Sequence, residues 1–281
     1  MKYFHVDVFT SRPMSGNGLT VVFHESPPDG GTLLKIAQEL RQFETAFVFP
    51  QSGGGAYPVR IFTMQEELPF AGHPVLGAAA VIHRVFYPSK TEAAVHIDLS
   101  GRSLTVESVS SDGLYTETMN QGVPEFLGAP SRELYEAVAR AVGLSLEDLD
   151  PDFPMEVVST GLKYLLVPVR NHLENARIAG SGFESFLGAL GAKFVYLFDP
   201  KTLECRTWDN SGAVEDVATG SAAGPLCAYL VRRGVKKEGE IIRLSQGRYL
   251  GRPSVIEGWV QDGKVCIRGS VAFFASGEIK N

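Results

Sequence analysis

Residues 59–84 read VRIFTMQEELPFAGHPVLGAAAVIHR, and residues 205–233 read CRTWDNSGAVEDVATGSAAGPLCAYLVRR. Each stretch begins with a strand-like run that holds an arginine and an aromatic residue. An acidic loop and a glycine follow, and an alanine-rich helix ends the stretch. Gly72 of the first stretch corresponds to Gly220 of the second. A supersecondary unit that returns along a chain indicates an internal repeat. The sequence therefore predicts two similar halves.

A second correspondence supports the repeat. Residues 41–50 read RQFETAFVFP and residues 159–169 read STGLKYLLVPV, and each places a polar turn immediately before an apolar strand. The chain of 281 residues also exceeds the usual size of one hydrophobic core. We predict an N-terminal half over residues 1–119 and a C-terminal half over residues 120–281, whose last strand can pack back onto the first half.

Short runs rich in β-branched and aromatic residues alternate with a few helical stretches, which predicts an α/β (α+β) fold. The run GVPEFLGAP at residues 122–130 is loop-like. Helices are predicted over residues 32–41, 74–83, 132–142, 183–190 and 221–233. Strands are predicted over residues 2–9, 19–23, 46–50, 59–63, 94–99, 104–109, 114–119, 163–169, 194–199, 205–209, 241–247, 253–260, 264–269 and 271–276.

The composition excludes several classes of protein. With 44% hydrophobic and 21% charged residues, the chain resembles neither a disordered segment nor a coiled coil. A formal net charge of -6 without a Lys/Arg-rich stripe argues against a nucleic-acid partner. The N-terminal residues lack the apolar core of a signal peptide, and no apolar run is long enough to span a membrane. We therefore predict a cytoplasmic protein without a membrane partner.

Cysteine and histidine spacing gives no sign of a disulfide frame or a metal centre. Cys205, Cys227 and Cys266 lie far apart without a CxxC pair, which predicts reduced thiols. The six histidines show neither HExxH nor HxH spacing, so we predict no metal site.

The first glycine-containing turn, Gly72-His73-Pro74, opens a predicted helix. Proline is tolerated at the first position of a helix, and Gly72 allows another group to approach the backbone closely. Backbone N–H groups at a helix start carry partial positive charge and can hold an anion such as a carboxylate. Residue types alone leave two readings open, a carboxylate site with His73 at its mouth or simply a well-formed helix start.

The second turn lies in VEDVATGSAAGPL at residues 214–226. Asp216 and Thr219 can cap the following helix, and Gly220 with Ser221 can offer N–H and hydroxyl donors to an oxyanion. The alternative is a capped, tightly packed helix that binds no ligand.

Two further polar residues stand out. Glu44, in QFETAFVF, lies between a predicted helix and an apolar strand, where a carboxylate can line a cleft or simply be solvated. Asn17-Gly18 is a strong hairpin signal, so spacing alone predicts a turn there rather than a ligand site.

Together these residues resemble the phenazine-biosynthesis (PhzF-like) family, which is similar in fold to diaminopimelate epimerase. The resemblance runs almost the whole length of the chain, and the order of its segments makes it specific. The segments are VDVFTSRPMSGNGLTVV at 6–22, RQFETAFVFP at 41–50, VRIFTMQEELPFAGHPVLGAAAVI at 59–82 and EDVATGSAAGPLCAYLV at 215–231.

The resemblance implies two similar domains, each a mixed, curled sheet or barrel around a central helix, with the active site in the cleft between them. The central helices would begin near His73 and Ser221. The resemblance also implies an isomerase that needs no cofactor. A carboxylate would take a proton from an activated carbon of a small cyclic or amino carboxylate and return it elsewhere along the conjugated system.

Residue roles follow from motif position. Glu44 resembles the family's acid/base glutamate, and His73 and Asp216 resemble residues that orient the substrate or stabilise its enol-like state. Backbone N–H groups of the glycine turns would bind the substrate's carboxylate. The substrate-binding candidates are Gly72, Gly220, Ser221 and Asn17.

Three positions depart from the family pattern. Gly18 stands where the family usually has proline, Met64 stands where proline is common, and Val217 replaces the proline of the usual Asp-Pro-Ala-Thr-Gly pattern. None of these changes removes a proposed proton-transfer group. Val217 alters backbone freedom in the second turn, so it bears on pocket shape and substrate more than on reaction class.

Two alternatives remain. A protein that binds or interacts with small carboxylates could keep the same fold without turnover, because fold does not establish activity. An amino-acid racemase or epimerase would need paired thiols at the two turns, and the turns contain none. The resemblance also implies a homodimer.

Overall fold

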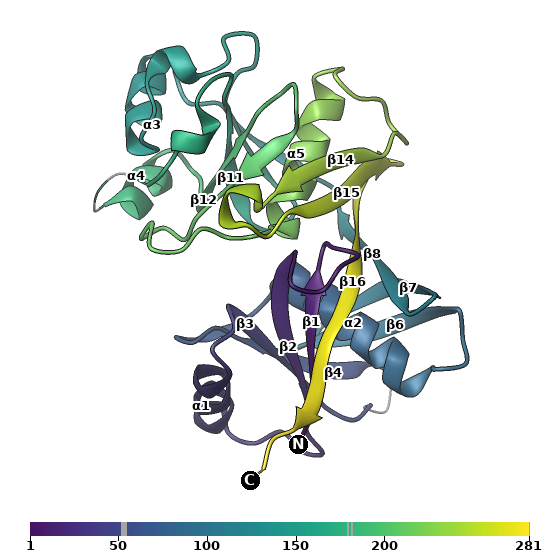
Figure 1. Ribbon diagram of the computed structural model, residues 1–281. Coiled ribbons are helices and arrows are strands. Elements are labelled where there is room, and N and C mark those ends of the chain that lie inside the picture. Colours follow the sequence, from purple (N-terminus) through teal and green to yellow (C-terminus); the bar gives the residue numbers. More distant parts are fainter. Residues whose placement is uncertain (52–54, 179, 181, 281) are drawn as a thin grey trace. The chain divides into compact units, whose positions relative to one another are not determined.

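The computed structural model describes residues 1–51, 55–178, 180 and 182–280 (Figure 1). The chain divides into two compact units, one formed by Met1–Asn120 with Arg268–Asn281 and the other by Gln121–Ile267. The second unit is therefore inserted, in sequence, between the main part of the first unit and its last strand. No helix within the described ranges is both long enough and apolar enough to cross a membrane.

The first unit is a closed β-barrel. Its strands are β1 (Lys2–Val8), β2 (Asn17–Phe23), β3 (Glu44–Val48), β4 (Tyr57–Phe62), β6 (Glu92–Leu99), β7 (Arg102–Ser111), β8 (Leu114–Gly122) and β16 (Lys264–Glu278), with the short β5 (Glu67–Leu68) paired to β4. The order is β1-β2-β3-β4-β6-β7-β8-β16, and β16 pairs with β1 as well. This last pairing closes the sheet on itself.

Helix α2 (Gly72–Phe86) is the central helix of the barrel, and every residue from Gly72 to His83 is buried. It packs against β1, β2, β3, β6 and β7. A Cβ atom at Gly77 would lie 2.4 Å from Leu19 Cδ2, so only glycine lets the helix approach β2 this closely. Helix α1 (Gly30–Leu40) is amphipathic instead, buries Leu33 and Ala37, and begins at Asp29, whose side chain accepts a hydrogen bond from Thr32 N.

The second unit repeats this topology. Its strands are β9 (Glu125–Gly128), β10 (Glu156–Ser159), β11 (Lys163–Pro168), β12 (Phe194–Phe198), β13 (Glu204–Arg206), β14 (Ile242–Gln246) and β15 (Ser254–Gln261), and its central helix is α5 (Gly220–Arg232). Successive pairings from β10 to β15 are antiparallel, parallel, antiparallel, parallel and antiparallel. The pairings of β1, β2, β3, β4, β6 and β7 follow the same sequence. The prediction of two similar mixed halves, each around a central helix, is confirmed.

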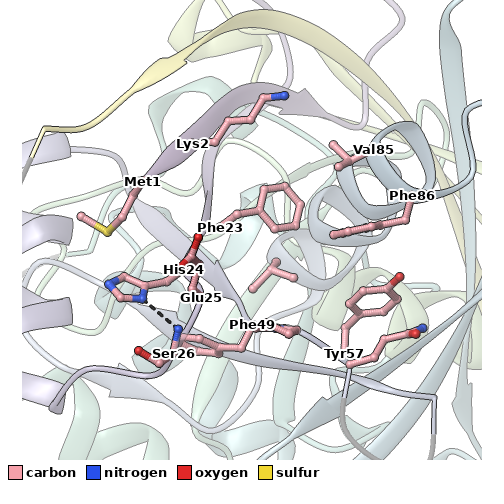
Figure 2. A pocket seen from close by; sticks show the side chains of 13 residues that line it. Met1, Lys2, Phe23, His24, Glu25, Ser26, Phe49, Tyr57, Val85 and Phe86 are labelled. Atoms are coloured by element: carbon pink, nitrogen blue, oxygen red, sulfur yellow. Dashed lines mark hydrogen bonds between the residues drawn. The ribbon is translucent and has the colours of Figure 1, made fainter.

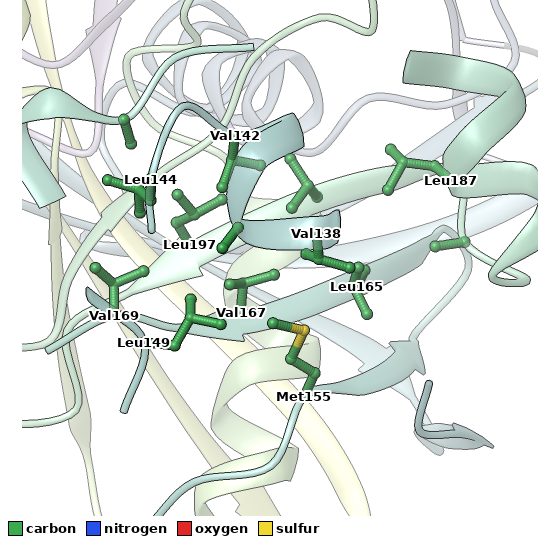
Figure 3. Packing of buried hydrophobic residues seen from close by; sticks show 14 of the residues in the cluster. Val138, Val142, Leu144, Leu149, Met155, Leu165, Val167, Val169, Leu187 and Leu197 are labelled. Atoms are coloured by element: carbon green, nitrogen blue, oxygen red, sulfur yellow. The ribbon is translucent and has the colours of Figure 1, made fainter. Parts of the chain in front are cut away.

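An apolar core in the second unit packs two short helices, α3 (Tyr135–Ala141) and α4 (Phe183–Ala189), against β11 and β12. Figure 3 shows how these side chains interlock. The members that it labels are Val138, Val142, Leu144, Leu149, Met155, Leu165, Val167, Val169, Leu187 and Leu197. Burial of branched aliphatic side chains at about 25 cal/mol per Å² is the main force that stabilises such a layer.

The repeat extends to side chains. Arg60 binds Glu67 through two hydrogen bonds, from Nε at 2.7 Å and Nη2 at 2.6 Å. Arg206 binds Glu215 in the same forked way, from Nε at 2.8 Å and Nη2 at 2.7 Å. Each guanidinium also lies over an aromatic ring two residues further along, Phe62 or Trp208. Each pair links the strand that precedes a central helix, β4 or β13, to the segment that leads into that helix.

The two pairs differ in burial. The side chains of Arg60 and Glu67 are 26% and 35% exposed, whereas those of Arg206 and Glu215 are 7% and 9% exposed. Arg206 Nη1 also donates to the carbonyl oxygens of Leu173 and Glu174. A buried, fully hydrogen-bonded charge is costly to leave without its partner.

We therefore expect Glu215→Gln to lower the free energy of unfolding by about 3 kcal/mol, because the buried Arg206 loses its charge partner. The same substitution at the more exposed pair, Glu67→Gln, should cost less than about 1 kcal/mol. Urea unfolding curves of the two variants measure the difference. Equal losses would contradict the view that burial makes the second pair the stronger constraint.

Several local predictions were wrong. Asn17 and Gly18 are the first residues of β2, paired with Val8 and Asp7, and not a turn. The chain reverses earlier, where Met14 and Gly16 both have a φ of 65°. There Asp7 Oδ2 accepts a hydrogen bond from Met14 N.

Three further differences concern strands. The predicted strands 264–269 and 271–276 form one continuous β16, because Gly269 and Ser270 keep an extended backbone. The predicted loop at 122–130 contains β9, an edge strand that pairs only with β10 among the described residues. The strand predicted at 205–209 ends at Arg206.

The second sequence correspondence was out of register. In the order of pairings, the counterpart of β3 is β12 and the counterpart of β2 is β11. RQFETAFVFP therefore matches the segment around β12 rather than STGLKYLLVPV. The position of Glu44, first in β3, is taken by Phe194, first in β12. Only the first unit carries a carboxylate there.

Candidate active site

Three candidate residues meet in the first unit because of where their elements begin. Asn17 opens β2, Glu44 opens the neighbouring parallel strand β3, and His73 is the second residue of α2. Parallel strands bring their starts to the same edge of a sheet, and the central helix begins beside that edge. The side chains of all three are buried, with exposed fractions of 2% for Asn17, 6% for Glu44 and 5% for His73.

His73 is contacted on both ring nitrogens. Its Nε2 lies 3.0 Å from Glu44 Oε2, and its Nδ1 lies 3.3 Å from Asn17 Nδ2. An amide nitrogen only donates, so Nδ1 accepts and the ring proton of a neutral His73 is placed on Nε2, while Glu44 Oε2 makes no hydrogen bond within the described residues. A carboxylate held against a histidine of fixed tautomer is an arrangement that can transfer or stabilise a proton.

The start of α2 leaves backbone donors without a side-chain cap. Ala71 occupies the cap position in an extended conformation and offers no side-chain acceptor. The N–H groups near Gly72 therefore keep the partial positive charge of a helix N-terminus beside the Glu44–His73 pair. Such donors suit a ligand carboxylate or a developing oxyanion.

In the second unit, Asp216, Gly220 and Ser221 lie in one turn at the start of α5. The prediction that the Thr219 side chain caps this helix was wrong. Thr219 occupies the cap position without a side-chain cap bond, and its hydroxyl donates to Asp216 Oδ2 instead. Ser221 Oγ lies 2.8 Å from the hydroxyl of Tyr164. The start of α5, like that of α2, thus keeps its backbone donors free of a side-chain cap.

Two residues of this turn's surroundings were missed. Gln246 hydrogen-bonds Asp216 and Thr219, and Gln121 Nε2 donates to Gly220 O at 3.0 Å. Gln121 is in turn held by Thr160, whose hydroxyl donates to its Oε1 at 3.0 Å. The signal for either residue in the sequence was only weak. Gln246 is a single glutamine at the end of a predicted strand, and Gln121 is a single glutamine next to a predicted loop.

Two of the three cysteines, Cys205 and Cys227, are poorly suited to acid/base work. Cys205 and Cys227 are fully buried, and burial raises the pKa of Cys227 to about 12 and that of Cys205 further still. Thiols that stay protonated are weak bases and nucleophiles. Within the described ranges, no three or more His, Cys, Asp or Glu side chains are grouped so that they could hold a metal ion.

A pocket of about 730 Å³ lies in the first unit away from these residues. Residues at the ends of β2 and β3 line this pocket, whereas Asn17 and Glu44 lie at the beginnings of the same strands. Figure 2 shows Phe23, Phe49, Tyr57 and Phe86 around it, with His24 Nδ1 accepting a hydrogen bond from Ser26 N. None of the residues proposed from the sequence lines this pocket.

Comparisons with known proteins agree with the fold and the motifs. Residues 6–277 match the model of the phenazine biosynthesis-like protein family. A trans-2,3-dihydro-3-hydroxyanthranilate isomerase from Pseudomonas chlororaphis is 31% identical over 270 residues, covering 90% of this chain and 88% of that protein.

Solved structures are similar to this chain as well. A predicted epimerase from Pseudomonas aeruginosa is 44% identical with a TM-score of 0.93, covering 100% of this chain and 99% of that one. A probable proline racemase from Agrobacterium radiobacter shares the fold alone, at 13% identity and a TM-score of 0.59, covering 99% of this chain and 92% of that one. The resemblance inferred from four sequence segments is confirmed. The chain belongs to the phenazine biosynthesis-like (PhzC–PhzF) family.

Proposed function

We propose that this protein is an isomerase that moves a proton on a small carboxylate by acid/base chemistry, without a cofactor. The observation that carries the proposal is the buried Glu44 carboxylate, 3.0 Å from His73 Nε2, beside the uncapped start of α2. Two relatives, which are 31% and 30% identical to this chain, are named as isomerases. Fold likeness alone would not justify the step, but a carboxylate and an imidazole at hydrogen-bond distance support it.

Glu44 is proposed to act as the base and then as the acid. Its carboxylate takes a proton from an activated carbon, the electron pair moves into the conjugated system, and the same carboxyl group returns the proton to another carbon. No electron or atom is gained or lost overall.

The other residues have binding and electrostatic roles in this proposal. His73 stabilises the enol-like intermediate through its Nε2 proton, and Asn17 holds the ring in that tautomer. N–H groups at Gly72 and Gly220 and the hydroxyl of Ser221 bind substrate oxygens, and Asp216 orients the substrate. The side-chain roles are separate, so each of them can be removed by one substitution.

Small cyclic or amino carboxylates with an acidic C–H bond are the proposed substrate class. The first compound to test is trans-2,3-dihydro-3-hydroxyanthranilate, which names the activity of a relative with 31% identity. The chain differs enough from that relative to act on a different carboxylate, and Val217 lies in the turn proposed to bind it.

The proposal is tested by incubating the protein with this compound and a panel of related carboxylates in heavy water. Absorbance reports conversion, and mass spectrometry reports deuterium on carbon, because a C–H bond that is repeatedly broken and re-formed exchanges with solvent. Conversion with labelled carbon supports the isomerase. Saturable binding of a panel member, without conversion or label, would replace it with a carboxylate-binding protein.

A further inference from the structure

The side chain of Gln246, at the end of β14, uses its full hydrogen-bonding capacity on the interior of the second unit. It is 1% exposed. Its Nε2 donates to Asp216 O at 2.9 Å and to Thr219 Oγ1 at 3.0 Å. Its Oε1 accepts from Thr219 N at 3.2 Å and from the Tyr196 hydroxyl at 3.0 Å. A side-chain amide has two donor protons and two acceptor lone pairs, so all four are used.

This network fixes the direction of the Thr219 hydroxyl. Because Thr219 Oγ1 already accepts from the Gln246 amide, its own proton is directed to another acceptor, and that acceptor is Asp216 Oδ2. Exchanging the amide's N and O would place its NH2 group against the Thr219 N–H donor, so only one orientation satisfies every group. Gln246 therefore controls a carboxylate that it does not touch, through one hydroxyl.

The backbone next to Gln246 reinforces the contact. Gly247 has a φ of 81°, and a Cβ atom there would lie 2.7 Å from Val217 O and 2.4 Å from Arg252 O. Any larger residue would push the strand end away from the turn. Gly247 therefore lets the chain after β14 pass close to the backbone of Val217, which lacks the ring that would fix its own φ.

We propose that Gln246 is a positioning residue, which sets the Asp216 carboxylate and the N-terminal turn of α5 through Thr219. The inference rests on the proposed isomerase function of the same turn. It adds that the geometry of the turn is imposed from β14, a strand remote in sequence, and that Thr219 acts as the link rather than as a helix cap. Buried, fully satisfied polar networks of this kind specify one conformation, because any alternative leaves a buried group unpaired.

The test compares Gln246→Met, which keeps the length but removes all four hydrogen bonds, with Tyr196→Phe. Of the four bonds of Gln246, the second variant removes only the one on the far side from the turn and leaves the three bonds to the turn. Amide hydrogen exchange of residues 216–221 is measured together with kcat and KM on the substrate that the wild type converts. Thermal unfolding of both variants shows the general cost of losing buried hydrogen bonds.

We expect Gln246→Met to speed exchange of the Thr219 amide at least tenfold and to lower kcat/KM by roughly ten- to hundredfold, the loss of a hydrogen bond to a charged group. Tyr196→Phe should lower the melting temperature less, because it removes one of the four bonds of Gln246, and should change kcat/KM less than about threefold. At Thr219 itself, Thr219→Val should reproduce the loss and Thr219→Ser should restore most of the activity.

Unchanged exchange in Gln246→Met, or faster exchange with unchanged kcat/KM, would overturn the positioning role while leaving the isomerase intact. Equal kinetic losses in Gln246→Met and Tyr196→Phe would also overturn it, because they would trace to stability alone. A wild type that converts no substrate is a different failure. It would remove the proposed function itself, and the role of Gln246 in it.

Discussion

Replacing Glu44 with glutamine is expected to lower kcat by about 10²- to 10⁴-fold, the range for loss of a positioned general base. Glutamine keeps the shape of the side chain and its place at the start of β3 but cannot take a proton from carbon. Deuterium incorporation from heavy water should fall with conversion, because both depend on the same C–H cleavage. Binding of the substrate should change much less, since the proposed oxygen-binding donors at Gly72 and Gly220 remain.

The matched control is Glu67→Gln, the same chemical change at a partly exposed carboxylate of the same unit. It should keep turnover within about twofold, because surface ion pairs contribute little. Thermal unfolding of both variants separates a catalytic loss from a folding defect, which matters because Glu44 is buried against His73. Full turnover by Glu44→Gln would exclude Glu44 as the proton carrier and direct attention to Asp216.

Sequence reasoning recovered most elements of the fold because most strands and helices have a local pattern of apolar residues that predicts them. The pairs Gly72–His73 and Gly220–Ser221 open buried, alanine-rich helices, as their spacing predicted. The Asn17-Gly18 prediction failed because the reversal before β2 uses positive φ at other residues, including Phe9 and Met14, where local propensity gives no warning. An Asn-Gly pair is compatible with a strand when the turn is already made upstream.

The register of the repeat and the support of the site were harder to predict. Apolar strands such as FVYLF at 194–198 and KYLLVP at 163–168 look alike in sequence, so only pairing distinguishes the counterpart of β3. Gln246 lies 30 residues from Asp216, and its role depends on a tertiary contact that no local pattern encodes. The resemblance to family motifs thus pointed to the proposed reacting groups, which local patterns had left open, while the residues that hold them were visible only in three dimensions.

A buried polar chain at the other end of α2 takes no part in the proposed reaction. His83 Nδ1 lies 2.6 Å from Ser108 Oγ, which lies 2.6 Å from Glu117 Oε1, and His83 Nε2 lies 2.9 Å from Lys90 O. All three side chains are buried, and Glu117 Oε2 has no hydrogen-bond partner among the described residues. Burial, opposed in part by the Ser108 hydrogen bond, raises the pKa of Glu117 to about 8.

Stability is therefore expected to fall as pH rises from 4.5, the ordinary value for glutamate, to about 8. Over this interval the unfolded chain releases the Glu117 proton while the folded chain retains it, so each pH unit favours unfolding by about 1.4 kcal/mol. The loss is roughly 5 kcal/mol at most and is complete above the folded pKa. Glu117→Gln, which keeps an oxygen that can accept from the Ser108 hydroxyl, should be about as stable as the wild type near pH 4.5 and several kcal/mol more stable at pH 8.5.

Urea unfolding at a series of pH values measures this difference, with Glu107→Gln as the control. Glu107 is an exposed carboxylate on the same strand as Ser108, so its variant should follow the wild-type pH profile. Parallel profiles for wild type and Glu117→Gln would show that Glu117 ionises in the fold without cost. The hydrogen bonds around Glu117 explain why that outcome is not expected. Ser108 Oγ donates to Glu117 Oε1, whereas Glu117 Oε2 has no hydrogen-bond partner among the described residues, so an ionised Glu117 would be buried with a single hydrogen bond.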